Sequence, residues 1–280
     1  MILIADSGST KTSWILTDGL EIIKQITTIG YNPYYHNNDS LLSSMNDDLL
    51  PVIDGIDIEK IFFYGSGCSS NINCTMVKSA LWQLFPNALV EVNHDLTGAA
   101  VALLNNNEGI ACILGTGSNS CHWDGKQIIQ NVPSVGYILG DEGSGTYIGM
   151  KILKGILEKT APSEIIKSYY HENNTSFEEV LTTIYNKPKP NNFISAVSIF
   201  AQNNISNSWV RETVKQSFTD FVENQIKQYS NYQNLESSFT GSIAYHFKDI
   251  LTETCHESGI KLGTIIKDPI KNLFLYHSNQ

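Results

Sequence analysis

The sequence predicts an α/β protein of two domains, and three observations lead to this prediction. A chain of 280 residues is long for a single hydrophobic core. In its first part, apolar strands alternate with helical patterns, which is typical of a sheet covered by helices. A strand, a Gly/Ser/Thr turn and a hairpin occur twice, near Gly8 and near Gly117. We interpret this repetition as two duplicated domains that face each other across a cleft.

The composition of the chain limits the kinds of molecule that we expect it to bind. A net charge of -10 and a pI of about 5.1 argue against nucleic acid or an anionic membrane as the partner. A small phosphorylated ligand stays open, because loop amides and a metal can hold phosphate without many lysines. The apolar run Met1–Ala5 is short, so no signal peptide is expected, and no stretch reaches the length of a membrane span. Five cysteines without a Cys-x-x-Cys pair indicate reduced thiols and a cytoplasmic protein.

The elements of the first half follow from short apolar runs bounded by turn residues. Asp39 or Ser40 is the expected N-cap of the first helix. The expected strands are Ile2–Ala5, Thr12–Asp18, Leu20–Ile29, Lys60–Tyr64 and Ala88–Val92, and the expected helices are Ser40–Leu50, Asn73–Phe85 and a helix from Asp95 to Leu104.

In the second half an apolar strand begins a second sheet, and an Asp-Gly turn predicts a hairpin after it. Residues 160–235 are polar and mostly helical, and we expect a helical insertion there, which is also a candidate homodimer surface. The expected strands are Gly109–Leu114, Cys121–Trp123, Lys126–Gln130, Ser237–Thr240 and Ile260–Lys267, and the expected helices are Gly143–Leu157, one from Ser242 to Cys255 and a short one after Asp268-Pro269.

The segment from Asp6 to Thr12 raises the question of a P-loop, because a lysine and a threonine follow a Gly/Ser run. Both glycines of the P-loop pattern are missing, and the residues after Lys11 favour a strand over a helix. We therefore predict a β-hairpin. On this stretch alone, an ordinary polar turn and a phosphate site are equally compatible with the residues.

Four glycine-rich turns follow predicted strands, where ligands of open α/β sheets bind and where glycine lets the backbone approach them. They lie at Gly8, Gly65–Gly67, Gly115–Gly117 and Gly241. Four acids lie near such strand ends, and each also has a structural explanation: turn capping, a helix N-cap or charge at a helix start. These acids are Asp6, Asp95, Asp141 and Glu142. For His94 we expect a structural role.

Taken together, these motifs resemble the N-acetylglucosamine kinases and the BadF/BadG/BcrA/BcrD ATPase family, members of the actin-like, Hsp70-like and sugar-kinase superfamily. The matching motifs run in the family's order from residue 6 to residue 242. They are Asp6-x-Gly8-x-Thr10-Lys11-Thr12, Asn93-His94-Asp95-Leu96-Thr97-Gly98-Ala99, Gly115-Thr116-Gly117-Ser118-Asn119, Gly140-Asp141-Glu142-Gly143-Ser144 and Thr240-Gly241-Ser242.

The resemblance implies two actin-like (ribonuclease H-like) domains, residues 1–105 and residues 106–268, the second of which contains the helical insertion. It also implies a terminal helix at 269–280 that packs back on the first domain. It implies an ATP- and Mg²⁺-dependent kinase that phosphorylates an amino sugar, N-acetylglucosamine on its 6-hydroxyl first of all. Asp95 would be the catalytic base, and Asp6 would hold Mg²⁺ through water. The ATP phosphates would meet Gly8, Ser9, Thr10, Lys11, Gly115, Thr116 and Gly117, the adenosine Gly241 and Ser242, and the sugar Asn32, Ser66, Asn119, Asp141 and Glu142.

The chain departs from the family at one motif and leaves two rival functions open. Val135 stands where the well-known N-acetylglucosamine kinases have a tryptophan, so part of the sugar pocket should differ. One rival is a BadF-like activator ATPase, which would need cysteine thiolates for an iron–sulfur cluster. The other is a nucleotide or sugar sensor that retains the fold without turnover.

Overall fold

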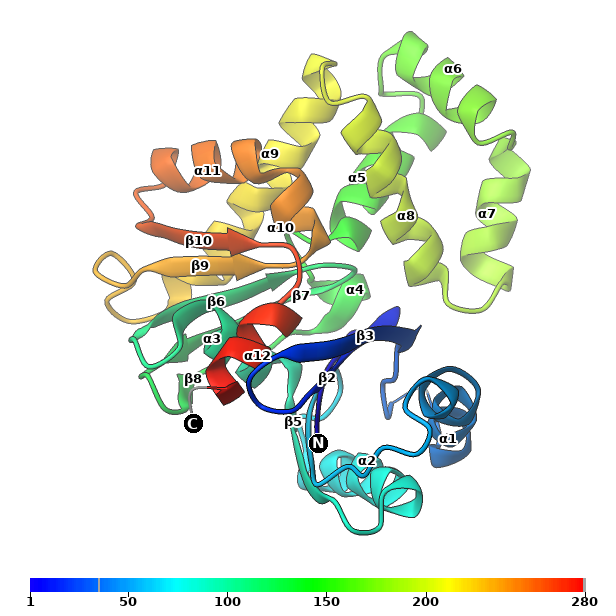
Figure 1. Ribbon diagram of the computed structural model, residues 1–280. Helices are drawn as coiled ribbons and strands as arrows, with labels where there is room; N and C mark the ends of the chain where they lie inside the picture. Colours follow the sequence, from blue (N-terminus) through cyan, green and yellow to red (C-terminus); the bar gives the residue numbers. More distant parts are fainter. Residues whose placement is uncertain (35, 279–280) are drawn as a thin grey trace. The chain divides into compact units, whose positions relative to one another are not determined.

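The computed structural model describes residues 1–34 and 36–278, which form two compact units (Figure 1). Unit 1 consists of Met1–Asn107, Gly125–Ile128 and the chain from Asp268 onward, and unit 2 of Glu108–Asp124 and Ile129–Lys267. The predicted terminal segment 269–280 is helical to Ser278, and its last two residues lie outside the described residues.

Unit 1 contains a mixed five-stranded sheet in the order β3-β2-β1-β4-β5. The strand β1 pairs antiparallel with β2 and parallel with β4, and β4 pairs parallel with β5. The strands are β1 Ile2–Ser7, β2 Lys11–Thr17, β3 Ile22–Ile29, β4 Lys60–Gly65 and β5 Leu89–His94. The helices are α1 Asn38–Ser44, the π-helical turn Met45–Leu49, the 3₁₀ turn Leu50–Val52, α2 Asn71–Leu84, α3 Asp95–Leu104 and α12 Ile270–Ser278.

Alternation along the strands of unit 1 sends apolar side chains to both faces of the sheet. On one face, Leu3, Trp14 and Phe63 pack with α1 and α2 into one hydrophobic core. On the other face α12 packs against α3 and against β1 and β2. Residues distant in the sequence therefore meet on this second face, near the carboxyl end of β1.

The helix α12 is fastened to unit 1 by polar and aromatic contacts. Asn272 Nδ2 donates to the carbonyl oxygen of Ala102 in α3 at 2.8 Å. The ring of His277 stacks on Phe62, with centroids 3.7 Å apart, and its Nε2 lies 3.0 Å from the hydroxyl oxygen of Tyr64. Burial lowers the pKa of His277 to about 4, so the ring is neutral in the folded chain at neutral pH.

Unit 2 contains a second five-stranded sheet, ordered β8-β7-β6-β9-β10. Counted from the first strand of each unit, both sheets have the order third, second, first, fourth, fifth. In both, the first strand pairs antiparallel with the second and parallel with the fourth. The strands are β6 Gly109–Leu114, β7 Ser118–Trp123, β8 Ile128–Gln130, β9 Ser237–Thr240 and β10 Leu262–Ile266.

The helices of unit 2 bury one continuous core against Ile110, Cys112 and Leu114 of β6. Side-chain caps begin several of them, including Ser144 on α5 and a complete capping box at Ser176 and Glu179 on α7. The helices are α4 Gly136–Leu139, α5 Gly145–Leu157, α6 Ser163–Glu172, α7 Phe177–Asn186, α8 Pro190–Asn203, α9 Ser208–Asn224, the 3₁₀ turn Ile226–Gln228, α10 Ser242–His246 and α11 Lys248–Glu257.

Two predicted helices differ from the structure, and one short helix was missed. The expected helix Ser40–Leu50 begins earlier, with Asn37 as its cap, and continues from α1 into π-helical and 3₁₀ turns. The expected helix from Ser242 to Cys255 is two helices, because Phe247 leaves the helical conformation between α10 and α11. The short helix α4 was not predicted, since its four residues are too few for periodicity to show.

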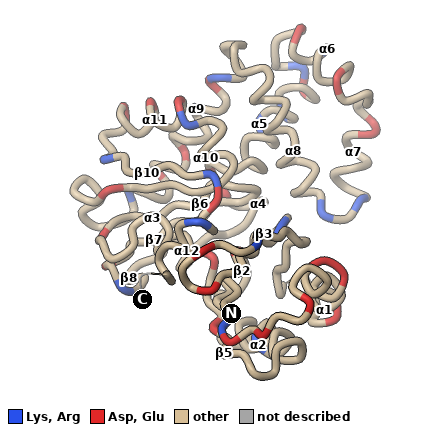
Figure 2. The backbone as a smooth tube through the Cα atoms, in the orientation of Figure 1, with Lys and Arg blue, Asp and Glu red and all other residues tan. Residues whose placement is uncertain are grey.

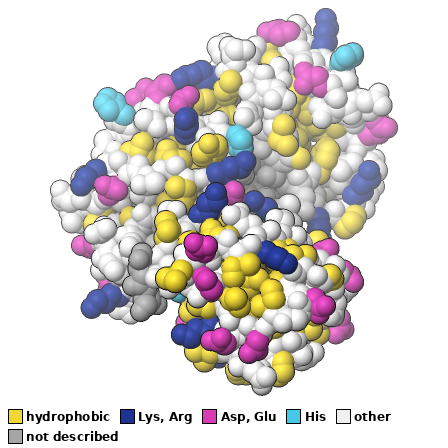
Figure 3. Space-filling model, in the orientation of Figure 1, with side chains coloured by type: hydrophobic (Ala, Val, Ile, Leu, Met, Phe, Trp, Pro, Cys, Tyr) yellow, Lys and Arg dark blue, Asp and Glu magenta, His cyan; other side chains and the backbone are white. Residues whose placement is uncertain are grey.

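Charge is distributed unevenly along the backbone. Acidic positions gather around α1 in Figure 2, where Asp39, Asp47 and Asp48 lie in or just after that helix. Side chains of both signs lie among apolar ones on the face drawn in Figure 3. Among the described residues, every helix is too short or too polar to cross a bilayer.

Candidate active site

The first glycine-rich turn connects β1 to β2 and is a hairpin, as predicted, because β2 rather than a helix follows Lys11. Gly8 N donates to Lys11 O at 2.9 Å, and Gly30 N donates to Thr10 O at 3.0 Å. A Cβ atom on Gly30 would lie 2.4 Å from Gly8 O, so the turn rests directly on the backbone after β3. Ser9 and Thr10 are exposed at its tip.

The Lys11 side chain at this turn is not isolated. Its Nζ lies 2.8 Å from Oδ1 of Asp268, the residue that precedes the segment leading into α12. Both side chains are partly exposed, so a ligand phosphate could exchange for the carboxylate with little loss of free energy.

Asp6 is the second-last residue of β1, beside the same turn, and other acids lie near it. Desolvation and, after it, the nearby charges of Asp95 and Asp268 raise the pKa of its carboxyl group to about 7, while Lys11 opposes the shift. The side chain still has some solvent exposure. The Asp6 carboxyl group therefore feels the charges of two further acids and one lysine, and a divalent cation would relieve the repulsion between the acids.

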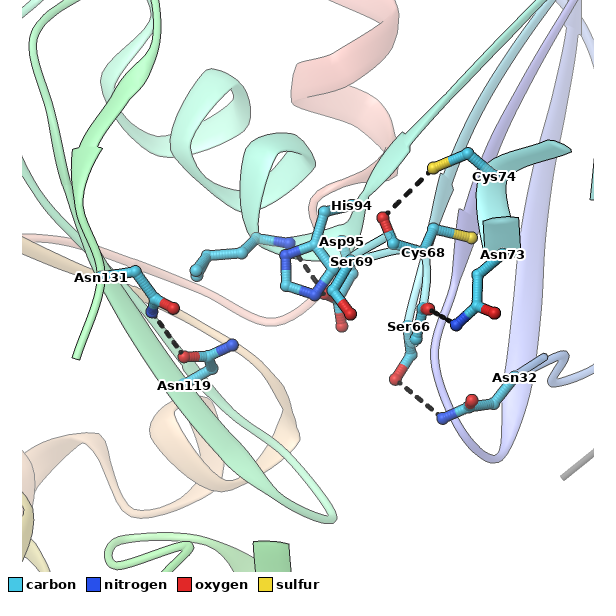
Figure 4. Close-up of polar contacts among 12 residues, drawn as sticks. Asn32, Ser66, Cys68, Ser69, Asn73, Cys74, His94, Asp95, Asn119 and Asn131 are labelled. Atoms are coloured by element: carbon cyan, nitrogen blue, oxygen red, sulfur yellow. Dashed lines mark hydrogen bonds and ion pairs between the residues drawn. The ribbon is translucent and has the colours of Figure 1, made fainter. Parts of the chain in front are cut away.

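Asp95 is the first residue of α3, and His94 rather than Asp95 occupies the N-cap position. The alternative of a simple N-cap is therefore wrong for Asp95. Its Oδ1 accepts a hydrogen bond from Leu96 N at 2.8 Å, and His94 Nε2 lies 3.1 Å from the same oxygen (Figure 4). Desolvation raises the pKa of Asp95, and the charge of His94 and the Leu96 amide oppose that shift.

Two predicted sugar-binding residues of unit 1 meet each other. Asn32 Nδ2 donates to Ser66 Oγ at 3.4 Å (Figure 4). Asn32 Oδ1 accepts from Tyr34 N at 3.0 Å. Gly67 has a φ of 79°, and a Cβ atom there would lie 2.3 Å from Asn32 Oδ1. Glycine is required at this position because Asn32 occupies the space beside it.

The second glycine-rich turn connects β6 to β7 and is held by the start of α5. Gly115 N donates to Gly117 O at 3.0 Å inside the turn. Gly145 N donates to Gly115 O at 2.8 Å, and Thr146 Oγ1 donates to Thr116 O at 2.6 Å. The two motifs are therefore one structure, because the first residues of the helix fix the carbonyl groups of the turn.

Asp141 and Glu142, which precede α5, point to different partners. Asp141 Oδ1 accepts from Ser134 Oγ at 3.2 Å, and a Cβ atom on Gly117 would lie 2.9 Å from Asp141 Oδ2. Desolvation raises the pKa of Asp141, while the Ser118 amide and the Ser134 hydroxyl oppose the shift. Glu142 Oε1 instead accepts from Asn224 of α9 at 3.0 Å. Of the two acids, only Asp141 lies against the turn.

The predicted adenosine motif lies beside the same turn. Gly241 has a φ of 123°, and a Cβ atom there would lie 2.2 Å from Leu114 O and 3.2 Å from Gly115 N. No side chain fits at this point, where β9 passes the end of β6 before Ser242 begins α10. Unit 2 thus brings Gly115–Gly117, Asp141 and Gly241 together.

Sequence reasoning missed several residues that support these groups. Gly30 contacts the backbone of the first turn, and Asp268 pairs with Lys11. Among the predicted sugar residues, Asn119 accepts a hydrogen bond from Asn131, and Asp141 accepts one from Ser134. His94 was assigned a structural role only, although its contact with Asp95 places it beside the predicted base. Adjacency to Asp95 was the one signal in the sequence; the other contacts join segments distant along the chain.

Comparison with known proteins shows where the chain belongs. No protein-family profile and no curated protein matches it. A crystal structure of a candidate N-acetylglucosamine kinase from Porphyromonas gingivalis matches 100% of this chain and 99% of its own, with a TM-score of 0.96 and 36% identity. The chain belongs to the family of that protein.

More distant structures show the fold alone. A candidate N-acetylglucosamine kinase from Chromobacterium violaceum matches 99% of this chain and 98% of its own, with a TM-score of 0.73 and 15% identity. A ROK family glucokinase from Streptomyces griseus, in complex with glucose and AMPPNP, matches 99% and 97%, with a TM-score of 0.60 and 11% identity. The fold is therefore the two-domain actin-like fold of sugar kinases, which confirms the predicted fold class.

Proposed function

We propose that this family member is an ATP-dependent sugar kinase that phosphorylates an amino sugar, with N-acetylglucosamine and its 6-hydroxyl as the first candidates. The observation that carries the proposal is the set of carboxylates at the carboxyl ends of β1 and β5, next to the Gly8 turn. Full-length similarity to the Porphyromonas gingivalis protein supports the choice of sugar. Membership in the BadF/BadG/BcrA/BcrD ATPase family stays a prediction from the motifs.

Asp95 is the proposed catalytic base. A kinase needs a carboxylate that accepts the proton of the attacking hydroxyl, which contributes about 10²–10⁴-fold to the rate. Desolvation raises the pKa of Asp95, which makes the carboxylate a stronger proton acceptor than a fully hydrated one. Because the Leu96 amide and His94 both lie at Oδ1, Oδ2 is the oxygen we assign to the substrate hydroxyl.

The glycine turns are proposed to hold ATP. In unit 1 the tip residues Ser9 and Thr10 are exposed, and Lys11 adds a positive charge at the turn. In unit 2 the Gly115–Gly117 turn is neutral, and we assign the adenosine to Gly241 and Ser242 beside it. Backbone amides in turns of this kind bind phosphate without much net positive charge, which agrees with the acidic composition.

Magnesium fits the residues of unit 1. Carboxylate oxygen is the ligand that Mg²⁺ prefers, and Asp6 lies in a negative environment that a cation would neutralise. Few protein ligands are needed, because Mg²⁺ keeps several waters; the described residues contain no group of three or more His, Cys, Asp or Glu suited to a metal. When bound, the ion would neutralise phosphate charge, and Asp6 would orient its waters.

The proposed sugar contacts are Asn32 and Ser66 in unit 1 and Asn119, Asp141 and Glu142 in unit 2. A Cβ atom on Gly140 would lie 2.8 Å from Val135 Cγ2, so Val135 lies beside Gly140, the residue before Asp141. The residue that departs from the family pattern therefore lies in a predicted sugar loop, where it can alter the choice of acyl group. The cytoplasmic setting stays a prediction from the cysteine pattern of the sequence.

The test is ADP release from Mg-ATP across N-acetylglucosamine, N-acetylmannosamine, glucosamine and glucose, with the product identified by ³¹P NMR. We expect N-acetylglucosamine to raise ADP release most and to yield a 6-phosphate. The proposal fails if no sugar raises turnover above the rate with ATP alone. Tight sugar binding without ADP release would then favour the sensor, and an iron-containing preparation would favour the activator.

A further inference from the structure

Two asparagines of unit 2 form a hydrogen-bonded pair, and only one of them, Asn119, belongs to a motif. Asn119 lies on β7, two residues beyond Gly117, and Asn131 follows β8. Asn131 Nδ2 donates to Asn119 Oδ1 at 3.1 Å (Figure 4). The two hydrogens of this nitrogen are shared with two backbone acceptors, Ser120 O at 2.6 Å and Val132 O at 3.1 Å. Asn119 Oδ1 also accepts from Ser120 N at 2.9 Å.

Backbone groups fix the orientation of both amides. A backbone N–H can only donate, so the Asn119 atom that faces Ser120 N must be the oxygen. Backbone carbonyls can only accept, so the Asn131 atom that faces Ser120 O and Val132 O must be the nitrogen. A flip of either side chain would set donor against donor or acceptor against acceptor, and the usual ambiguity of amide orientation is therefore removed here.

The hydrogen bonds of the pair engage the oxygen of Asn119 and leave its amide nitrogen without a partner among the described residues. Its oxygen is engaged by two donors, and its amide nitrogen points away from Asn131 in Figure 4. Asn119 is only partly buried, and its amide nitrogen is the atom that we assign to a ligand. A ligand atom that meets it must accept a hydrogen bond.

We infer that Asn131 is a positioning residue that makes Asn119 a hydrogen-bond donor to the sugar. The matching sugar atom is then an acceptor: a hydroxyl oxygen or the carbonyl oxygen of an acyl group. This inference rests on the proposed sugar-kinase function and deepens it, because it assigns the polarity of one subsite. A site of fixed polarity rejects ligands that offer only a donor, since a buried amide proton would stay unpaired.

The first experiment compares Asn131→Ala with Asn204→Ala. Asn204 also donates from its side chain to a backbone carbonyl, that of Phe200, but at the end of α8. We expect Asn131→Ala to raise the KM for the sugar about fivefold, the loss of roughly one hydrogen bond, with little change in kcat or in the KM for ATP. Asn204→Ala should leave all three unchanged. Equal effects of Asn131→Ala on the KM of ATP and sugar would overturn the inference.

A double-mutant cycle distinguishes positioning from a general structural role. In an Asn119→Ala background, Asn131→Ala should have almost no further effect on the KM for the sugar, because the group that it orients is gone. An effect of the same size in both backgrounds would contradict the inference. Sugar analogues add a test of polarity: at the contacted position a fluoro analogue, which keeps an acceptor, should bind better than the deoxy analogue.

The inference can be separated from the proposed function by NMR. In ¹⁵N-labelled protein, the side-chain amide signal of Asn119 should shift when a sugar of the panel binds, and the Asn131 signal should shift less. This result would support the inference even if the sugar is bound and not phosphorylated, in which case only the kinase proposal fails. Absence of an Asn119 shift with every sugar would overturn the inference whether or not ADP is released.

Discussion

The turns at Gly8 and at Gly115 occupy the same position in two sheets of the same strand order, but they are supported differently. The first turn rests on Gly30, and Lys11 at its end pairs with Asp268. The second is fixed by hydrogen bonds from Gly145 and Thr146 at the start of α5. The first turn is therefore surrounded by charges of both signs, whereas the second is held by neutral polar groups and has one acid, Asp141, beside it.

This difference indicates a division of labour between the two units. Unit 1 brings the acids together, so electrostatics should dominate the behaviour of its turn. Unit 2 offers oriented amides whose geometry depends on close packing of glycine and on helix capping. Substitutions near the two turns should consequently differ in size and in their sensitivity to salt.

The largest expected effect comes from a methyl group at Gly30. In Gly30→Ala the new Cβ would lie 2.4 Å from Gly8 O and 2.6 Å from Thr10 N, both backbone atoms that cannot rotate away. We expect the free energy of unfolding to fall by about 1–3 kcal/mol and the KM for ATP to rise, because the turn must move. Urea unfolding and ADP release measure both.

Gly8→Ala is the matched control for stability, because its Cβ would lie 3.7 Å from Lys11 O, an ordinary contact. Its cost should stay below about 0.5 kcal/mol. A larger loss of stability at Gly8 than at Gly30 would show that the turn does not rest on Gly30.

The next effect concerns the second turn. Thr146→Val keeps the shape of the side chain and removes the hydrogen bond to Thr116 O. We expect a loss of about 1 kcal/mol in stability, together with a higher KM for ATP that does not depend on salt. Thr219→Val removes a similar bond, to Lys215 O inside α9, and should lower stability without changing the KM. If Thr146→Val and the unsubstituted chain have the same KM for ATP, the hydrogen bond from α5 is not needed for the function of the turn.

A smaller effect is the pH dependence of stability that His277 gives to unit 1 through its terminal helix. The folded pKa of His277, about 4, lies below the unfolded value of 6.5, so the unfolded chain binds the extra proton. The stability that this group contributes is present above pH 6.5 and is lost as the pH falls toward 4. We expect the loss near pH 5 to be only about 1 kcal/mol, because the ring is half-buried and solvent screens its charge. His277→Gln should lose less stability between pH 7.5 and pH 5 than the unsubstituted chain, as urea midpoints will show. Parallel curves would mean that His277 is protonated in the folded state.

The smallest effect is the ion pair between Lys11 and Asp268. Because both side chains are partly exposed, the pair should contribute less than about 1 kcal/mol to folding and fade at high salt. A double-mutant cycle with Lys11→Met and Asp268→Asn measures this coupling. Lys11→Met should also raise the KM for ATP. A coupling that persists in 1 M salt would mean that the pair is structural and is not available for phosphate.

The sequence predicted the order of strands and helices well where apolar residues are continuous. The strands Gly109–Leu114 and Ser237–Thr240 have the predicted limits, because a glycine turn follows each of them directly. The division of the helix after Ser242 at Phe247 was not predicted, because the apolar spacing continues across the break. Local patterns determine the element, and the tertiary environment determines where it ends.

The site was predicted less completely, for a physical reason. Glycine turns and acids at strand ends can be recognised from short segments, as at Gly8 and Asp6. Asp268 and Asn131 could not be recognised, because each acts through a contact with a residue far away in the sequence or on a neighbouring strand. Only the folded chain shows that these residues orient the groups that the motifs name.

The most direct test of the central claim is Asp95→Asn, assayed for ADP release with N-acetylglucosamine and for ATP binding by calorimetry. The substitution keeps the size of the side chain and removes its ability to accept a proton. The account predicts a loss of about 10²–10⁴-fold in kcat with ATP affinity nearly unchanged. An Asp95→Asn enzyme that retains the rate of the unsubstituted chain would contradict it and would leave the carboxylate at the end of β5 without a catalytic role.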